Sequence, residues 1–369
     1  MFKKSILYIA ATALLGVSCI YPYNADIPEE TKNALVVDGK IVIGGYSTVT
    51  LSQLLSLKGR AEGIPSGDVF LEEENGATYT GVLMRPGQYS IPAQEANPDS
   101  RYRLRVESGG KTYSTDWITL IAAPDIEDLN ISADRQNVNV LLSFSSRDEG
   151  YGYAAVSFQE IWYFHVEYLQ MLTYDPESNS VAPITSPDLT YYYCWNKTSY
   201  SNEKIIDYSY IDKEVKGYKI LSFSRMANRN HGDYTIKIRL RNLTEQEYRY
   251  KKNLDEASSM GSSLFTPEPG EIESNIRCIS DEDTPVYGYV NISKVSVATA
   301  HMDGRYFKTH TPSPLMLLDP ADYYDYYTIY GYVPVDMTSN DTGSGPGWGL
   351  KSCVNCVAAG GTLEKPDFD

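Results

Sequence analysis

Apolar and polar residues alternate in short runs between residues 34 and 123, which is typical of β-strands with one buried face. From residue 101 to 106 every second residue is an arginine, and the residues between them are Tyr, Leu and Val. Asn75-Gly76 suits a hairpin turn, because both residues tolerate positive φ angles. The rhythm of these runs predicts an immunoglobulin-like β-sandwich over residues 34–123.

A second, larger domain is predicted over residues 124–369, because strand-like runs continue there at uneven spacing. One helix interrupts them at residues 245–260. Thr244 and Glu247 have the spacing of a capping box, in which each side chain hydrogen-bonds an exposed amide of the first turn. Residues 339–369, rich in Gly and polar residues, are expected to be mostly irregular. The predicted fold class is all-β: an N-terminal immunoglobulin-like sandwich followed by a larger, mainly β domain with one helix.

The N-terminus has the pattern of a lipoprotein export signal. Two lysines precede an apolar run, and a small residue then precedes Cys19. The apolar run is short for a membrane span, so we expect residues 1–18 to be removed. Cys19 would become a diacylglyceryl cysteine, with palmitate among its acyl chains, because two chains anchor a protein stably. Residues 19–33 are expected to form an extended tether. A soluble secreted protein and an uncleaved anchor are the alternatives.

Charge excludes one class of partner. The sequence has 48 acidic and 32 basic residues, a formal net charge of -16. A protein this acidic repels phosphate backbones, so nucleic acid is not expected as a partner.

Four cysteines remain besides Cys19: Cys194, Cys278, Cys353 and Cys356. An even number in an exported protein is compatible with two disulfides. We favour a local Cys353–Cys356 bridge and a long-range Cys194–Cys278 bridge, and the two other connectivities remain open. Cys353 and Cys356 also have the spacing of a redox pair or half a zinc site. The Gly-rich flanks do not indicate the helix of a redox motif, and no second Cys or His pair supplies zinc ligands, so no metal is expected.

Tyrosine outnumbers phenylalanine 32 to 9, which places hydroxyl groups where aromatic bulk is needed. Clustered tyrosines could stack sugar rings or contact a protein partner, because tyrosine combines apolar area with a polar tip. Tyrosine is also a favoured strand residue, so β-structure alone explains many of these positions. The candidate contact surface comprises Tyr191, Tyr192, Tyr193, Trp195, Tyr323, Tyr324, Tyr326 and Tyr327, with Tyr330 and Tyr332 nearby.

The sequence shows few signs of catalysis. Its four histidines lack metalloprotease spacing, and it has neither a Gly-x-Ser-x-Gly elbow nor a phosphate-binding Gly-Lys loop. An acid pair for glycoside hydrolysis is not recognisable from spacing alone. Residues 281–283 lack the alternation of a calcium loop and favour a solvated acidic turn. We therefore expect a protein that binds rather than catalyses, without a cofactor, and a hydrolase is the least favoured interpretation.

Several stretches, in order along the chain, carry a family resemblance: residues 35–39, 243–250, 261–265 with Pro269, 274–276, 288–290, 353–362 and 365–368. Together they resemble the outer-membrane lipoproteins of Bacteroidota that carry domain of unknown function 4249. The resemblance spans nearly all of the mature chain, and Asp369 departs from it where an aromatic often stands. It implies an N-terminal immunoglobulin-like domain joined to a larger β domain. It also implies that the protein acts beside TonB-dependent outer-membrane transporters. It implies no activity.

These observations predict a lipid-anchored accessory protein of a Gram-negative outer membrane, which could be exposed at the cell surface. It would bind a nutrient, such as a glycan or peptide, or a partner, for a TonB-dependent transporter. The alternative is a structural or adhesive surface lipoprotein.

Overall fold

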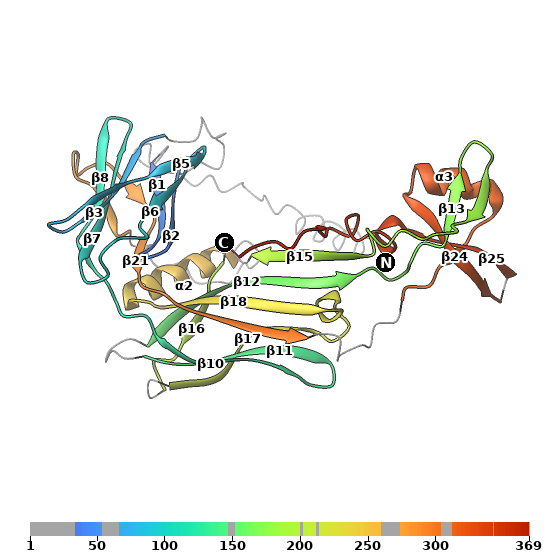
Figure 1. Cartoon of the computed structure of the whole chain (residues 1–369). Coiled ribbons are helices and arrows are strands. Elements are labelled where there is room, and N and C mark those ends of the chain that lie inside the picture. The colour runs from blue at the N-terminus through green and yellow to red at the C-terminus, as the bar shows by residue number, and fades with distance from the viewer. Residues whose placement is uncertain are drawn as a thin grey trace, which may run out of the picture.

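The computed structural model is all-β, as predicted, and its strands form three units along one axis (Figure 1). The sandwich comprises residues 34–121 and 274–293, and the central unit comprises residues 125–165, 193–242 and 296–303. The distal lobe comprises residues 167–184 and 312–354, and it lies at the opposite end of the molecule from the sandwich (Figure 1). Cys19 and the predicted signal and tether lie outside the described residues. The structure describes residues 34–53, 66–146, 152–199, 202–211, 214–259, 274–303, 312–341 and 343–368.

The sandwich has two sheets around a shared core. Its strands are β1 (Leu35–Val42), β2 (Tyr46–Gln53), β3 (Asp68–Glu73), β4 (Thr78–Thr80), β5 (Val82–Arg85), β6 (Gln88–Pro92), β7 (Arg101–Ser108), β8 (Lys111–Thr115), β9 (Ile118–Thr119), β19 (Ile276–Cys278), β20 (Val286–Tyr287) and β21 (Val290–Ser293). One sheet has the order β20-β1-β2-β6-β5, with β21 also on β1, and the other β19-β8-β7-β3-β4, with β9 on β7. Apolar side chains of both sheets, including Ile41, Val69 and Leu104, are buried in one cluster.

Strand β7 confirms the alternation seen in the sequence. Tyr102, Leu104 and Val106 are fully buried. On the opposite face, Arg103 and Arg105 both donate hydrogen bonds to the Glu72 carboxylate of β3. The period-2 pattern therefore separates a buried apolar face from a face of ion pairs.

The sandwich takes three strands from beyond the predicted boundary at residue 123. After the helix the chain returns, so that β20 and β21 pair with β1 in parallel and β19 pairs with β8 antiparallel. Gly288 makes this close return possible: its φ is +111°, and a Cβ there would lie 2.0 Å from the carbonyl oxygen of Val37. The sandwich is therefore completed by residues 274–293, which period-2 alternation between residues 34 and 123 does not reveal.

The central unit also has two sheets. Its strands are β10 (Asp125–Ala133), β11 (Asn137–Ser145), β12 (Tyr153–His165), β15 (Tyr193–Ser199), β16 (Lys204–Asp207), β17 (Glu214–Ser224), β18 (Asp233–Asn242) and β22 (Ser296–Asp303), with a short helix η2 (Asn228–Asn230). The sheets have the orders β10-β11-β17 and β15-β12-β18-β22, with β16 also on β12. They enclose the largest apolar cluster, which includes Phe144, Val156 and Ile238.

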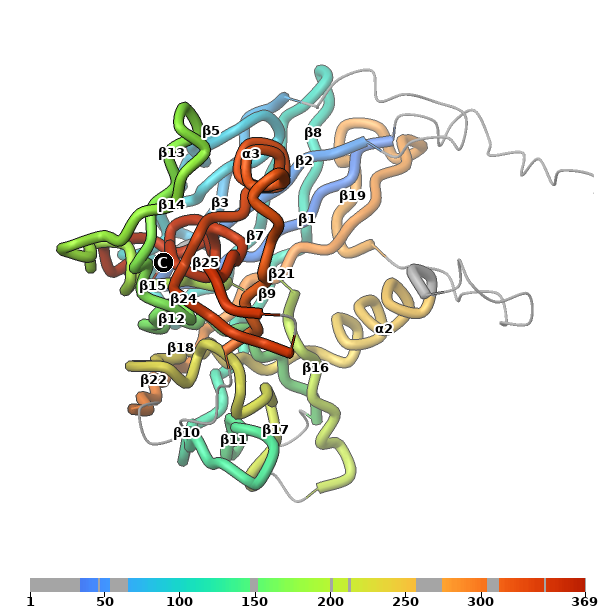
Figure 2. The backbone as a smooth tube through the Cα atoms, turned by 90° about the vertical axis from the view of Figure 1, so that its right-hand side faces the viewer, coloured from blue at the N-terminus to red at the C-terminus, as the bar shows by residue number. Residues whose placement is uncertain are grey.

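Helix α2 (Glu245–Ser259) confirms the predicted helix and half of its capping box. The Glu247 amide donates to Thr244 Oγ1 at 3.0 Å, as the motif requires. The Glu247 carboxylate instead binds Arg241 and Asn291, because a guanidinium is a stronger partner than a backbone amide. Figure 2, which looks along the axis of the molecule, shows α2 beside the sandwich and above β16. Within the described residues, no helix is both long and apolar enough to cross a membrane.

The distal lobe corrects in part the prediction that residues 339–369 are mostly irregular, because residues 343–353 form a strand and a short helix. It contains a hairpin of β13 (Leu172–Asp175) and β14 (Ser180–Pro183), a sheet of β23 (Met316–Leu317), β25 (Gly343–Leu350) and β24 (Tyr332–Asn340), and helices η5 (Pro320–Asp322), α3 (Tyr323–Thr328) and η6 (Lys351–Cys353). Gly349 lies in β25, although glycine is unfavourable in most strands. A Cβ at this position would lie 2.6 Å from Cys353 Sγ, so Gly349 makes room for the neighbouring side chain.

The disulfide differs from the favoured pairings. Cys194 on β15 is bonded to Cys356, and Cys278 and Cys353 are free. Cys278 is buried in the sandwich core, in a different unit from Cys194. Backbone hydrogen bonds in both directions between Trp195 and Thr362, at 2.8 Å, continue the attachment of the tail. The bridge therefore fastens the C-terminal tail to the central unit.

Candidate functional site

The structure separates the predicted aromatic residues into two groups. Tyr191, Tyr192, Tyr193 and Trp195 lie on or just before β15, in the central unit or beside it. Residues 323–327 lie on α3, in the distal lobe. The two groups therefore do not form one surface and have to be considered separately.

The first group packs largely against its own neighbours. Tyr163 of β12 lies with its ring centroid 5.6 Å from that of Tyr193 and 5.0 Å from that of Trp195. His165 stacks on Tyr192 at 5.5 Å. Lys365 of the C-terminal tail lies over the Trp195 ring. These contacts favour a packing role for Tyr192 and Trp195.

The second group has an inner and an outer face. Tyr323 is buried, with its ring 4.8 Å from that of Trp348, and so belongs to the core of the distal lobe. Tyr327 contacts Tyr174 at 5.1 Å and remains partly exposed. The two remaining tyrosines differ in exposure: Tyr324 is exposed and Tyr326 is half-buried. Only part of the predicted run is therefore available to a partner.

Further apolar side chains of the distal lobe are also exposed. Ile329 is 68% exposed and Tyr330 is 59% exposed, although both follow α3 directly. Sequence reasoning did not single out Met316, Ile329 or Met337, because an isolated apolar residue next to a loop carries no periodic signal. We call the following residues the distal surface: Met316, Tyr324, Tyr327, Ile329, Tyr330 and Met337.

A pocket of about 390 Å³ opens beside this surface. The Tyr326 ring lies 5.3 Å from the Tyr330 ring at an interplanar angle of 55°, and 5.4 Å from the Tyr332 ring at 81°. Two carboxylates and one thioether complete the wall. We call this the tyrosine–aspartate pocket; it is lined by Met316, Asp322, Asp325, Tyr326, Tyr330 and Tyr332.

A second hollow, of about 460 Å³, adjoins the first, because Met316 and Tyr332 line both. Its wall is more apolar and includes Leu315, Trp348 and Leu350, so we call it the apolar groove. Cys353 also lines it. Burial raises the pKa of the Cys353 thiol to about 11, so the group stays protonated at neutral pH and is a poor nucleophile.

Another exposed apolar run lies at the far end of the molecule. Val82, Leu83 and Met84 on β5 are 57%, 57% and 67% exposed. β5 is an edge strand of the sandwich, where a partner strand could add. None of these three residues lines the tyrosine–aspartate pocket or the apolar groove, which distinguishes this run from the distal surface.

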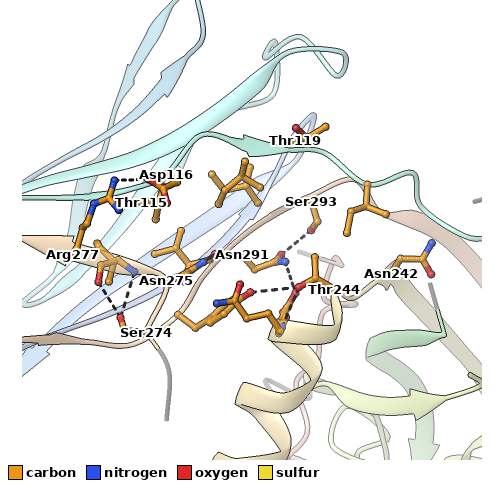
Figure 3. Close-up of a pocket in the computed structure, with 18 residues that line it drawn as sticks. Thr115, Asp116, Thr119, Asn242, Thr244, Ser274, Asn275, Arg277, Asn291 and Ser293 are labelled. Atoms are coloured by element: carbon orange, nitrogen blue, oxygen red, sulfur yellow. Dashed lines mark hydrogen bonds and ion pairs between the residues drawn. The ribbon is translucent and has the colours of Figure 1, made fainter. Parts of the chain in front are cut away.

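A third pocket, of about 310 Å³, lies where the sandwich meets α2 (Figure 3). Several of its polar groups already have partners within the protein. Asn275 exchanges two hydrogen bonds with the Val290 backbone, and Asn291 donates to Glu247. Thr244 accepts from the helix amide. Because these groups are already hydrogen-bonded, the pocket is better explained by packing between the sandwich and α2 than by a ligand site. We call this contact the joint, and the pocket the joint pocket.

The joint is closed by a buried cluster of charges. Arg241 of β18 donates two hydrogen bonds to Glu203 and two to Glu247, at 2.6–2.9 Å. The Arg241 side chain is 5% exposed and that of Glu247 is 2% exposed. Asn291 of β21 binds the same Glu247 carboxylate at 2.8 Å. One guanidinium thus connects the central sheet, α2 and, through Asn291, the sandwich; we call this the Arg241 cluster.

The described part of the chain contains no group of three or more His, Cys, Asp or Glu side chains placed to hold a metal ion. At the acidic turn near residue 281, the Asp281 carboxylate accepts hydrogen bonds from Lys111 at 2.9 Å and from Thr284 at 2.6 Å. These contacts fit the predicted acidic turn.

Comparison with known proteins identifies the family. No curated protein matches the chain. A solved structure from Bacteroides uniformis, described as a "putative carbohydrate binding protein", matches at 12% identity and a TM-score of 0.17, covering 58% of this chain and 92% of that one. A DUF4785 family protein from Legionella pneumophila matches at 11% identity and a TM-score of 0.17, covering 56% of this chain and 52% of that one. TM-scores this low support no functional assignment. The model of the family described as domain of unknown function DUF4249 matches residues 20–299, which is most of the chain, and the protein therefore belongs to that family.

Proposed function

We propose that this protein is a lipid-anchored accessory protein of a Gram-negative outer membrane. It works by binding rather than by catalysis, and its distal lobe is the contact surface for a partner or nutrient. The partner is a TonB-dependent transporter, and the nutrient is a glycan or a peptide. The observation that carries the proposal is the distal lobe, where an exposed aromatic surface adjoins two pockets.

Exposure of these side chains supports a contact role. A soluble domain gains free energy by covering large apolar side chains, so exposed groups beside a pocket are typical of binding sites. Tyrosine and methionine are enriched at interfaces because they combine contact area with adaptable packing. By contrast, the polar groups of the joint pocket are satisfied within the protein.

The position of the distal lobe also supports the proposal. The first described strand, β1, belongs to the sandwich, at the opposite end of the molecule from α3 and β24 (Figure 1). Fourteen residues lie between Cys19 and Ala34, and such a segment spans at most about 50 Å when extended. An anchor at Cys19 would therefore attach at the sandwich end and leave the distal lobe free to meet a partner.

The anchor and the partner are tested by purifying the full-length protein from membranes of its own cells. We expect mass spectrometry to find acyl chains on Cys19, the protein to fractionate with the outer membrane, and a TonB-dependent transporter to co-purify from mild detergent. A Cys19→Ser variant should lose the lipid and appear in the soluble fraction. Cys278→Ala is the matched control, because it removes a free thiol outside both the signal and the distal lobe.

The outcomes separate the two parts of the proposal. An unmodified N-terminus with soluble fractionation would exclude the anchor. Lipidated protein recovered without any transporter would exclude the partner, and would favour a structural or adhesive surface lipoprotein.

A further inference from the structure

We propose that the tyrosine–aspartate pocket binds an organic cation, either an alkylammonium or a guanidinium group. This inference rests on the proposed function, since it names the ligand chemistry of the same lobe. The pocket combines three tyrosine rings and two carboxylates within about 390 Å³, a volume that suits one small group or one side chain.

The aromatic part of the wall provides a cation-binding face. The Tyr326 ring meets Tyr330 at 55° and Tyr332 at 81°, so the three rings form a corner instead of a flat stack. The faces of aromatic rings carry partial negative charge and attract ammonium and guanidinium groups within about 6 Å. The protein already uses this interaction elsewhere: the Arg229 guanidinium lies 5.0 Å from the Trp162 ring centroid.

The carboxylates supply the charge. Asp322 precedes α3 and Asp325 lies in its first turn, and residues three apart on a helix lie on the same face. No ion pair or side-chain hydrogen bond joins either carboxylate to another described residue, and no described basic side chain lines the pocket. Asp319, just before them, differs, because its carboxylate accepts the Ala321 amide at 2.9 Å. Two negative charges with no cationic neighbour among the described residues favour a positive ligand.

Charge also separates this ligand from the alternatives. An anion would be repelled by both carboxylates and by the net charge of -16. A neutral sugar could stack on the tyrosines, but its binding would be insensitive to salt. Cation binding weakens as salt rises, because the pocket is open to solvent.

The cation could be a free small molecule or a side chain of a peptide. The adjoining apolar groove would accept a neighbouring apolar residue of a peptide, because Met316 and Tyr332 line both hollows. The probes are therefore choline, arginine amide, and the dipeptide acetyl-leucyl-arginine amide. Acetyl-leucyl-citrulline amide is the neutral match, since citrulline keeps the shape of arginine without its charge.

Binding is measured by calorimetry on the detergent-solubilised full-length protein. We expect the arginine dipeptide to bind at least tenfold more tightly than the citrulline dipeptide, and less tightly as salt increases. Asp325→Asn and Tyr330→Leu should each weaken arginine binding at least tenfold. The matched controls are Asp341→Asn, in the β24–β25 turn, and Tyr210→Leu, an exposed tyrosine of the central unit; each should change arginine binding less than twofold. Thermal melts confirm that all variants fold.

If citrulline binds as tightly as arginine, or if Asp325→Asn leaves arginine binding unchanged, the cation assignment is wrong. If choline and arginine amide bind as tightly as the dipeptide, the ligand is a small cation; if only the dipeptide binds, it is a peptide. Should no cation bind while changes to the distal surface still abolish transporter recovery, this inference fails and the proposed function stands. If changes to the distal surface also leave transporter recovery unchanged, both fail.

Discussion

Replacing Arg241 with Met should lower the free energy of unfolding by about 3–5 kcal/mol, because it leaves the carboxylates of Glu203 and Glu247 buried without their guanidinium. Denaturant unfolding followed by circular dichroism measures the change. Arg249→Met is the matched control, since it breaks an exposed i,i+4 pair with Glu245 and should cost at most about 0.5 kcal/mol. Adding Glu247→Gln to Arg241→Met should recover part of the loss by removing one uncompensated charge. Equal effects of Arg241→Met and Arg249→Met would contradict the role of the cluster.

The same cluster should make stability depend on acid. Burial alone would raise the pKa of Glu203, but the charges and hydrogen bonds of Arg241 and Lys251 outweigh burial and hold that pKa well below its ordinary value. A carboxylate with a lowered folded-state pKa stabilises the fold fully above its unfolded pKa and loses this contribution as pH falls below it. Wild-type stability should therefore decrease below about pH 4.5, and Arg241→Met should show a shallower decrease.

Removing the disulfide should have a comparably large effect. The Cys194–Cys356 bridge spans a sequence separation of 162 residues. In the chain-entropy model a loop of this length contributes up to about 5 kcal/mol, and measured losses are typically about 2–5 kcal/mol. Replacing both cysteines with Ala, which leaves neither bridge partner as a new free thiol, should lower the unfolding midpoint and make it insensitive to reductant. Under reducing conditions, the unfolding midpoint of the wild-type protein should approach that of the double variant.

Cys353→Ser is the control for this experiment, because Cys353 is free and its loss leaves the bridge intact. Peptide mapping of the native protein should recover residues 194 and 356 in one cross-linked pair. A Cys353–Cys356 cross-link, or equal midpoints with and without reductant, would contradict the pairing.

Local pattern predicted much of the secondary structure. The alternation over residues 101–106 predicted which face of β7 is buried, and Thr244 predicted the start of α2. Both signals depend only on neighbours along the chain, which the sequence contains. The pairing of β20 and β21 with β1 could not be read in this way, because partners some 250 residues apart leave no local signal.

The candidate site was only partly predictable for the same reason. The tyrosine run at residues 323–327 indicated the distal lobe, but tertiary packing decided that Tyr323 is buried and Tyr324 is exposed. Asp322 and Asp325 were not singled out, because two acids in a helical turn acquire a binding role only once Tyr330 and Tyr332 lie beside them. The disulfide was predicted wrongly because spacing favours near cysteines, whereas the fold places Cys194 against the C-terminal tail.

The most direct test of the binding role compares two sets of three substitutions in the full-length lipoprotein. Each set replaces three exposed residues with Ser: Tyr324, Ile329 and Tyr330 on the distal surface, or Val82, Leu83 and Met84 on β5. Transporter recovered from solubilised membranes is then quantified, with thermal melts to confirm folding. If the distal lobe is the contact surface, the distal set reduces recovery more than tenfold and the β5 set leaves it unchanged. Loss of recovery with the β5 set alone would contradict this assignment and move the contact to the opposite end of the molecule.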